Sequence, residues 1–511
     1  MSFLGFKDES KLPKTLGELK KSPWKSRSVK SEIRENLILK LKNKETLFDG
    51  ILGYEHTVEE QIINALLSEH NFILLGLRGQ GKTKIIRQIV HFLDPYTPVL
   101  KGSLLNEDPF NPISAWAKKT IKEKGDATAI TWLAKEDRFK EKLATPDVSI
   151  ADLIGDLDPI KAVREKLDLS NEEVIHWGII PRSNRGIFAI NELSDLQPRI
   201  QVGLFNILEE KDIQVRGFPL RIPMDILLLF SANPEDYTNR GRIVTPLKDR
   251  INSQIITHYP KTVEIAKKIT KNEIDIKTEV VIPEIIYDTA ERIAFVARES
   301  DLVDPTSGVS QRLSIAALEL IAANAQRRAF LYANSERKVR WMDIYAAVGA
   351  ITGKIELIEE RHQDDLIKVG VNFIGQAARA TFDTLFPALG KNIKRNIEIS
   401  QETIEEDLSF DNFDKKIDTR FLTIIDFFKK GGRLELSDEM DDATFSKNLA
   451  KVDGLEKIAT EHAKKNDVPD VPLMMEILLD GLFQYGLVNR KMEDGCLSFY
   501  DVYSSMMDNL Q

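Results

Sequence analysis

One eight-residue stretch, residues 76–83, constrains the fold of this chain more than any other. It reads Gly-Leu-Arg-Gly-Gln-Gly-Lys-Thr and fits the phosphate-binding pattern G-x-x-x-x-G-K-[ST] at every fixed position. An apolar, strand-like run precedes it at 71–75, and a run with apolar residues at helical spacing follows it at 84–93. A strand, a glycine-rich loop and a helix in this order predict a nucleotide-binding α/β domain with a parallel sheet.

The residue types in this loop suit a phosphate chain. Glycines let the backbone curl so that N–H groups point inward at phosphate oxygens. In this pattern the lysine reaches the β- and γ-phosphates, and the hydroxyl of the last residue holds Mg²⁺. The alternative is a chance glycine turn before a helix. The predicted nucleotide-binding residues are Gly76, Arg78, Gly79, Gln80, Gly81, Lys82 and Thr83.

Composition narrows the class of protein. The chain has 511 residues, enough for about three domains, and its 42% hydrophobic and 30% charged residues are typical of a globular protein. Its net charge of −9 argues against a dedicated nucleic-acid binder. A single cysteine, Cys496, the lack of a signal-peptide pattern at the start, and the lack of an apolar run near the ~20 residues that span a bilayer lead us to expect a cytoplasmic protein without a membrane span.

A second apolar run, at 186–190, ends in Asn191 and Glu192. At this place an ATPase carries two acidic residues, of which one organises Mg²⁺ through water and the next polarises the attacking water. Glu192 fits the second role. Asn191 occupies the first position, where its amide can accept a hydrogen bond from a metal-bound water but brings no negative charge. We therefore expect weaker metal organisation and slower turnover. A helix-start carboxylate is the alternative reading of Glu192.

Three further residues are candidates for the same chemistry. Asn233 follows a third apolar run, at 224–231, and its amide could orient a water opposite the γ-phosphate; an Asn-Pro turn is the alternative. Arg250 could stabilise transition-state charge in a neighbouring subunit, unless it only forms a surface ion pair. Arg312 stands at the start of a predicted helix, where a cation is disfavoured, so it indicates an anionic partner such as phosphate or an acidic side chain.

We expect four regions along the chain. Residues 1–46 form a basic arm, interpreted as solvated and amphipathic, with a binding arm as the alternative. Residues 37–41 of this arm could form a short helix that packs on the next domain, and 47–259 form the nucleotide-binding domain. Residues 260–360 form a helical lid, with a last helix at 341–359, and 361–511 form a helical interaction region with an acidic linker at 402–407. Within the nucleotide domain we expect a helical insertion at 113–142, one helix at 198–210 and a hairpin at 212–222.

Taken in order, these motifs make residues 47–360 resemble the AAA+ ATPases of the magnesium chelatase small-subunit and MoxR group. The resemblance implies that Lys82 and Thr83 bind Mg²⁺ and ATP, that Glu192 is the catalytic glutamate and that Asn233 senses the γ-phosphate. By position, Arg250 would be the arginine finger and Arg312 the lid arginine. The resemblance also implies a hexameric ring, a mobile hairpin and an insertion near 156–180. Members of the group commonly act with a partner that carries a von Willebrand factor A-type domain.

The leading functional hypothesis is an ATP-hydrolysing motor that remodels or activates a partner protein. Three alternatives stay open. The chain could be the motor subunit of a porphyrin metal chelatase, or a slow-turnover, nucleotide-gated scaffold, which Asn191 favours. A transcriptional-activator ATPase of the sigma-54 type is disfavoured, because we find neither a Gly-Ala-Phe-Thr-Gly-Ala loop nor an obvious helix-turn-helix.

Overall fold

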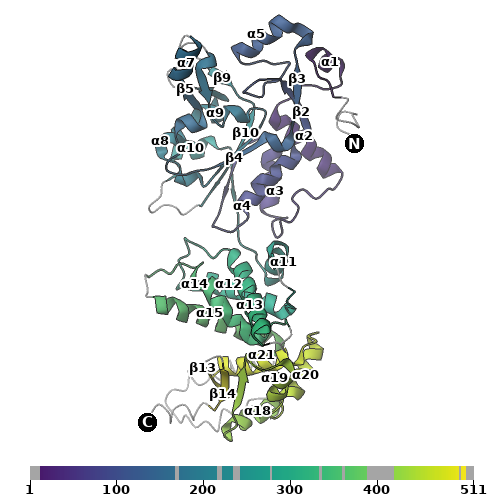
Figure 1. Ribbon diagram of the computed structural model, residues 1–511, viewed down its shortest axis with the longest axis vertical. Coiled ribbons are helices and arrows are strands. Elements are labelled where there is room, and N and C mark those ends of the chain that lie inside the picture. The colour runs from purple at the N-terminus through teal and green to yellow at the C-terminus, as the bar shows by residue number, and fades with distance from the viewer. Residues whose placement is uncertain are drawn as a thin grey trace. The chain divides into compact units, whose positions relative to one another are not determined.

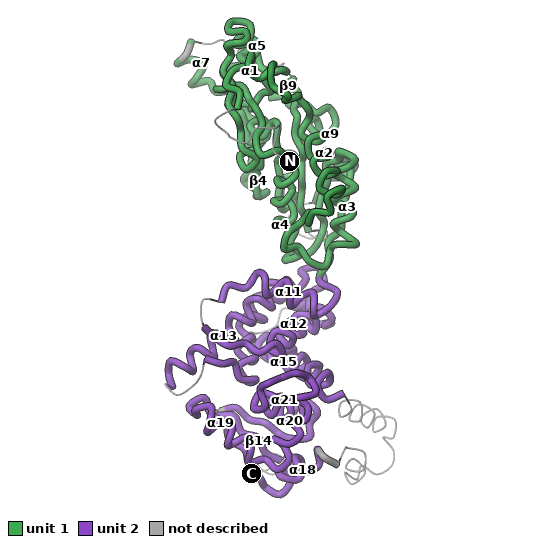
Figure 2. Tube along the Cα trace, turned by 90° about the vertical axis from the view of Figure 1, so that its right-hand side faces the viewer, with its two compact units in different colours: residues 1–259 green, residues 260–511 purple. Residues whose placement is uncertain are grey.

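A computed structural model describes residues 12–166, 172–215, 221–233, 242–276, 279–332, 337–359, 363–387, 419–493 and 496–501. The chain divides into two compact units, residues 1–259 and 260–511, which Figure 2 shows in separate colours. Each unit has its own fold and is described by itself. Among the described residues, no helix combines the length and the apolar character that a membrane span requires.

The first unit is built on a five-stranded sheet in which every neighbouring pair of strands is parallel. The carboxyl ends of all its strands therefore meet at one edge (Figure 1). This architecture confirms the predicted α/β class. In spatial order the strands are β11 (Ser253–Ile256), β1 (Phe72–Leu75), β10 (Ile226–Ala232), β7 (Gly186–Asn191) and β4 (Phe139–Leu143).

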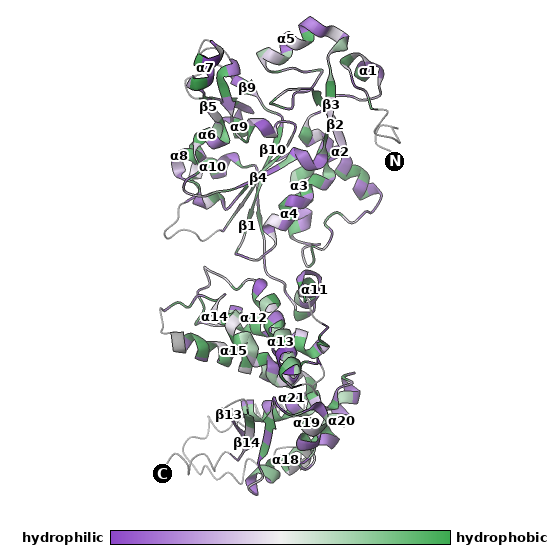
Figure 3. Ribbon diagram, in the orientation of Figure 1, coloured by the Kyte–Doolittle hydropathy of each residue, from purple (hydrophilic) through white to green (hydrophobic). Residues whose placement is uncertain are grey.

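Helices cover both faces of this sheet because its central strands are apolar on both sides. Along β7, Ile187 and Ala189 enter one core, and Phe188 and Ile190 enter the other. The first core includes residues of α2 (Val29–Lys42), α3 (Val58–Leu67) and α4 (Lys82–Gln88). The second includes residues of α8 (Pro198–Val202), α9 (Phe205–Glu209) and α10 (Thr245–Arg250). In Figure 3, α3 carries both hydrophobic and hydrophilic residues, as expected for a helix that packs one face on a core.

The predicted helical insertion at 113–142 is wrong over most of its length. Helix α5 (Ala115–Lys124) is followed by β3 (Ile130–Ala134), a short 3₁₀ turn and β4. Gly125, with a φ of 52°, ends the helix. The next segment then pairs antiparallel with β2 (Tyr96–Leu100), in keeping with its Ile, Thr and Trp residues.

Smaller predicted elements are present with interruptions. Helix α4 continues as a 3₁₀ turn at Ile89–Phe92, and the helix expected at 198–210 is broken at Gly203 between α8 and α9. The expected hairpin consists of β8 (Asp212–Gln214) and β9 (Arg221–Pro223), and its turn at 216–220 lies outside the described residues. The insertion carries α6 (Ile150–Leu153), β5 (Gly155–Leu157), α7 (Pro159–Glu165) and β6 (Ile175–Trp177).

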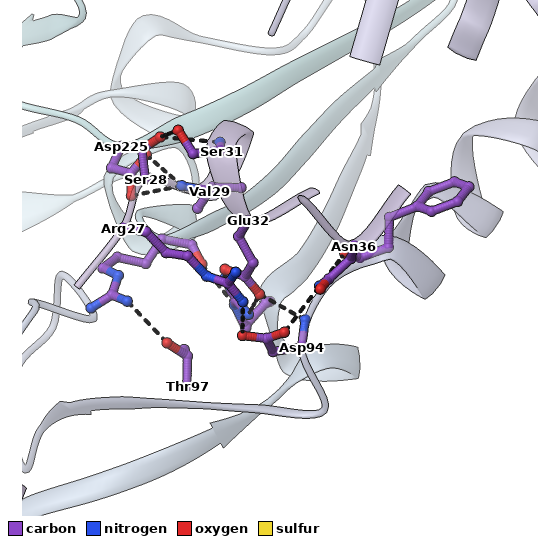
Figure 4. Close-up of polar contacts among 12 residues, drawn as sticks. Arg27, Ser28, Val29, Ser31, Glu32, Asn36, Asp94, Thr97 and Asp225 are labelled. Atoms are coloured by element: carbon purple, nitrogen blue, oxygen red, sulfur yellow. Dashed lines mark hydrogen bonds and ion pairs between the residues drawn. The ribbon is translucent and has the colours of Figure 1, made fainter. Parts of the chain in front are cut away.

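The interpretation of the amino-terminal arm as solvated is wrong for its described part, whereas the helix expected at 37–41 is present as the end of α2 and packs through Leu37. Helix α1 (Leu16–Lys21) contacts the turn after α5, and α2 buries Val29, Ile33 and Leu37 in the core beneath the sheet. Figure 4 shows why charged residues do not prevent this packing: Arg27, Glu32 and Asp94 point toward one another across the interface. Most of the described lysines of the arm are exposed, whereas Lys30 is half-buried and burial lowers its pKa to about 8.

The second unit is mainly helical and contains one continuous hydrophobic core. That core joins α12 (Glu284–Glu299), α13 (Arg312–Leu331), α15 (Gln363–Leu385) and α21 (Val471–Gln484), so residues on both sides of position 360 share it. The remaining helical elements are α11 (Val263–Glu273), η9 (Trp341–Ala347), α14 (Val348–Thr352), α18 (Thr419–Lys429), α19 (Asp442–Leu449) and α20 (Leu455–Lys465).

Two features of this unit differ from expectation. The helix expected at 341–359 is a 3₁₀ turn followed by the single turn of α14, which ends at Gly353. A three-stranded antiparallel sheet, which the sequence did not indicate, lies among the carboxyl-terminal helices: β12 (Leu434–Ser437), β14 (Cys496–Tyr500) and β13 (Asn489–Glu493). The acidic stretch at 402–407 lies outside the described residues.

Candidate functional site

The phosphate loop runs from the end of β1 into the first turn of α4. Gly79 and Gly81 both have a φ of 75°, a left-handed conformation that glycine adopts without strain. A Cβ on Gly76 would lie 1.9 Å from Thr257 Oγ1 and 2.2 Å from Gln80 Oε1. The loop therefore needs glycine for its conformation at two positions and for space at a third.

Lys82 and Thr83 are the first two residues of α4. Lys82 is only 7% exposed, and its ammonium group donates hydrogen bonds to the carbonyl oxygens of Gly76 and Leu77, the latter at 2.9 Å. Thr83 is half-buried beside it. Arg78, at the tip of the loop, is exposed. The lysine is thus folded against the loop that it would share with a phosphate chain.

Residues far away in the sequence hold the loop in place. The Tyr54 hydroxyl lies 2.9 Å from the carbonyl oxygen of Gln80 and 2.7 Å from that of His258. Thr257 donates a hydrogen bond of 2.6 Å to Gln80 Oε1, and Tyr259 donates one of 2.9 Å to the carbonyl oxygen of Arg78. No sequence motif pointed to these residues, because their role depends on the fold bringing residue 54 and residues 257–259 to the loop.

Asn191 and Ser231 lie on one face of the sheet, near the edge where the strands end, and Asn233 follows directly after β10. Side chains alternate along a strand, and the residues preceding each of them on this face, Ala189 and Leu229, belong to the core that α4 covers. The Ser231 hydroxyl donates a 3.2 Å hydrogen bond to Asn191 Oδ1. Asn233 Oδ1 is buried and has no hydrogen-bond partner among the described residues, so it can accept one from a ligand or a water.

Glu192 follows directly after β7 with a φ of 55°. A left-handed conformation is uncommon for a glutamate and costs of order 1 kcal/mol, and such strain clusters at functional sites. Its backbone N–H lies 3.4 Å from the Ser231 hydroxyl, which links it to the same strand ends. The side chain is half-buried. Position and conformation together are typical of a catalytic residue at a strand end.

Arg250 ends α10, away from the loop. Its Nε donates a 2.7 Å hydrogen bond to Glu209 Oε2 on α9, and its guanidinium carbon lies 4.6 Å from the centre of the Phe205 ring. The predicted arginine finger is therefore held by its own chain. Nearby, the backbone carbonyl oxygen of Arg242 accepts a hydrogen bond of 3.0 Å from Gln201 Nε2.

Arg312 belongs to the second unit, where it is the first residue of α13 and is exposed. Its neighbours fix the helix start. Ser310 accepts a hydrogen bond of 3.1 Å from the Arg312 backbone N–H, and Gln311 is buried and donates one of 2.7 Å to Glu291. The Arg312 side chain is thus presented at the surface of its unit.

The first unit therefore brings together the loop, Asn191, Glu192 and Asn233 at the ends of β1, β7 and β10. A further neighbour of this group was also missed by sequence reasoning. Glu141, from the middle of β4, has its Oε2 3.5 Å from Asn191 Nδ2 and accepts hydrogen bonds from Arg87 on α4. The segment containing Glu141 was expected to be helical, so its place beside β7 could not be foreseen.

Comparisons with known proteins agree with this picture. No family model matches the chain. Over 223 residues, covering 41% of this chain and 58% of the relative, the sequence is 24% identical to magnesium-chelatase subunit ChlI of Euglena gracilis. Over 87 residues, covering 17% of this chain and 18% of the relative, it is 31% identical to the hydrogenase transcriptional regulatory protein HoxA of Cupriavidus necator. The chain thus spans less than two thirds of the length of each.

A solved structure of the complex between subunits BchI and BchD of magnesium chelatase also aligns with the chain, at 16% identity and a TM-score of 0.34, over 63% of this chain and 98% of that one. The match to ChlI, the phosphate loop and the parallel sheet, whose strand ends carry the predicted polar residues, carry the assignment. In these features the chain is similar to the AAA+ ATPases related to the magnesium chelatase subunit ChlI, as its motifs predicted.

Proposed function

We propose that this protein is an ATP-hydrolysing motor that remodels or activates a partner protein. One observation carries the proposal. The phosphate loop lies at the end of β1, and Asn191, Glu192 and Asn233 lie at the ends of β7 and β10, where β10 pairs with both β1 and β7. A phosphate-binding group and a water-activating group therefore share one edge of one sheet, as hydrolysis of a nucleoside triphosphate requires.

The residues at this edge fit Mg²⁺ and ATP. Left-handed Gly79 and Gly81 shape a loop that can direct N–H groups at phosphate, and Lys82 is the adjacent cation. The buried Asn233 Oδ1 needs a donor, which a water beside the γ-phosphate would provide. Thr83 and Asn191 would hold the metal, by hydroxyl and through water respectively. When bound, Mg²⁺ offsets negative charge on the phosphate oxygens.

The chain's own groups then have distinct tasks. The Glu192 carboxylate accepts a proton from the attacking water, and the Asn233 amide orients that water. Lys82 stabilises charge that develops on the phosphate oxygens. Arg250 does the same from a neighbouring copy of the chain, once its bond to Glu209 is released.

A function as a motor also requires an oligomeric assembly and a partner protein on which it acts. We place the chain in a hexameric ring whose nucleotide sites lie between copies, with Arg312 as the lid arginine. Nucleotide turnover would move the β8–β9 hairpin and the 156–180 insertion against a partner with a von Willebrand factor A-type domain. The family resemblance supports these points, together with the presence of the hairpin in the first unit.

Two substitutions test the proposal. Lys82→Ala should abolish measurable ATP binding, whereas Glu192→Gln should keep binding and lower the hydrolysis rate by at least about 100-fold, the lower end of what a general base contributes. Lys122→Ala and Glu210→Gln, on exposed surfaces of the same unit, are matched controls that should leave both quantities unchanged. ATPase activity that is unaffected by either of the two test substitutions would rule out the motor.

A nucleotide-gated scaffold is the second candidate, because Asn191 brings no negative charge to the metal side of the site. Single-turnover kinetics separate the two functions: bound ATP that persists for hours while partner binding stays intact favours the scaffold.

A role as the motor of a porphyrin metal chelatase draws on the similarity to ChlI. ATP-dependent metal insertion on reconstitution with a porphyrin-binding partner would support it, and its absence would count against it.

A further inference from the structure

Glu141 lies beside Asn191 in a geometry that the strand pairing imposes. Strand β4 pairs in parallel with β7, with Leu143 opposite Asn191 and Glu141 opposite Ala189. Residues two apart on a strand share a face. Glu141 is opposite Ala189, two residues before Asn191, so the Glu141 and Asn191 side chains lie on the same face, the one that α4 covers. Its Oε2 lies 3.5 Å from Asn191 Nδ2.

The two ends of the Asn191 amide meet different partners. An ionised carboxylate can only accept hydrogen bonds, so the amide NH₂ must face Glu141. The amide oxygen then faces Ser231, whose hydroxyl donates to it at 3.2 Å. A carbonyl oxygen has two acceptor sites, so it can also accept from a metal-bound water. The carboxylate thus selects which of two nearly isosteric orientations the amide adopts.

Arg87 limits what Glu141 can contribute. It comes from α4, the helix that begins with Lys82, and its Nε lies 3.1 Å from both carboxylate oxygens of Glu141. The pair is close to neutral, so Glu141 offers orientation to Asn191 rather than free negative charge. The pair also ties the edge strand to the phosphate-loop helix.

We propose that Glu141 is a positioning residue that fixes the Asn191 amide with its oxygen toward the metal-bound water, and that residues 141 and 191 act as a matched donor–acceptor pair. This inference rests on the proposed function. It explains the unusual asparagine: an aspartate at position 191 would place two carboxylates about 3.5 Å apart, where like charges repel. The double substitution Glu141→Gln and Asn191→Asp exchanges the carboxylate and the amide. The amide at position 141 then donates a hydrogen bond to the carboxylate at position 191, with donor and acceptor reversed.

The test is a double-substitution cycle with Glu141→Gln, Asn191→Asp and both together. For each full-length variant, a fluorescent ATP analogue is titrated with Mg²⁺ in excess and again in EDTA, and the ratio of the two dissociation constants measures the metal's contribution. Each single substitution should reduce that ratio by about fivefold, the size of one polar contact. The double variant should return to within about twofold of the wild type, and binding in EDTA should not change.

Glu45→Gln, which breaks the Lys40–Glu45 surface ion pair, is the control and should leave the ratio unchanged. Equal effects of Asn191→Asp with and without Glu141→Gln would overturn the inference, as would a Glu141→Gln variant that behaves like the control. If Glu141→Gln alone does not fold, the comparison of Asn191→Asp with the double variant still decides. A wild type that binds no nucleotide in either buffer would instead refute the proposed function.

Discussion

At the scale of single residues, Tyr54 controls the shape of the phosphate loop. Burial raises the pKa of its hydroxyl to about 12, against the lowering effect of its hydrogen bond to His258. The hydroxyl therefore keeps its proton at neutral pH and acts as a donor. It lies within reach of two carbonyl oxygens, those of Gln80 and His258, and so joins the loop to the segment that follows β11.

We predict that Tyr54→Phe weakens ATP binding by roughly fivefold. The substitution leaves a buried carbonyl oxygen of the loop without its donor, which costs about 1 kcal/mol. Isothermal titration calorimetry measures the affinity. Tyr259→Phe is the matched control, because it removes a hydroxyl of the same type from the exposed carbonyl oxygen of Arg78 and should change the affinity less than twofold. Equal losses in the two variants would show that the buried contact has no special role.

Some residues of the candidate site can be recognised from a short sequence motif, and others cannot. Gly76–Thr83 and Asn191–Glu192 could be found because each motif adjoins an apolar strand in the sequence itself. Tyr54, Thr257 and Glu141 could not, because each reaches the site through a tertiary contact: Glu141 by strand pairing, Thr257 by the return of the chain after β11, and Tyr54 by packing of the segment before α3. Local pattern predicts what a strand end carries, whereas the neighbours of that strand end depend on the whole sheet.

At the scale of elements, helix α2 shows how charged residues mislead a prediction of exposure. Glu32 and Arg138 form a bidentate ion pair, with hydrogen bonds of 2.7 and 2.6 Å and side chains 3% and 0% exposed. Burial tends to raise the pKa of Glu32, yet the bonds from Arg138 lower it below its ordinary value, so the carboxylate stays ionised. Asp225 accepts from the first backbone N–H of α2 at 3.0 Å (Figure 4).

We predict that Glu32→Gln lowers the free energy of unfolding of the first unit by about 3 kcal/mol, because it leaves the buried Arg138 guanidinium without its counter-charge. Lys20→Gln is the control. It breaks the exposed Lys20–Asp126 pair, whose side chains are 53% and 68% exposed, and should cost less than about 1 kcal/mol. Urea unfolding followed by tryptophan fluorescence measures both. If the two variants unfolded alike, the arm would contribute little to the unit's stability.

The elements that could be predicted from the sequence are those whose hydrophobic residues follow a single clear pattern, either a continuous apolar run or a helical period. Strands β7 and β10 are continuous apolar runs, and α12 and α13 carry long stretches with a helical period. Strand β4, Phe-Lys-Glu-Lys-Leu, alternates charges at the sheet edge and looks like part of a polar helix. Short strand β12 lies between α18 and α19, whereas β13 and β14 follow α21, so the pairing of β12 with β14 is a tertiary effect.

At the scale of the whole molecule, Arg250 is the residue whose proposed role requires a second copy of the chain. Within its own copy it pairs with Glu209, on the outer side of α9, and that side chain is 56% exposed. An exposed ion pair contributes at most about 1 kcal/mol, so a γ-phosphate presented by a neighbouring copy can displace Glu209. The cis pair is compatible with a monomer that becomes competent only on assembly.

We predict that two inactive variants regain activity when they are mixed. Lys82→Ala keeps Arg250 but cannot bind ATP, and Arg250→Ala keeps the loop but should lose about 1,000-fold in rate. Random assembly of equal amounts in a closed ring gives about one site in four with an intact loop facing an intact arginine, so about a quarter of wild-type ATPase activity should return. The control mixes Lys82→Ala with a Lys82→Ala/Arg250→Ala double variant and should stay inactive. If mixing restores no ATPase activity, Arg250 does not act between copies. The proposed ring would then not be needed for catalysis.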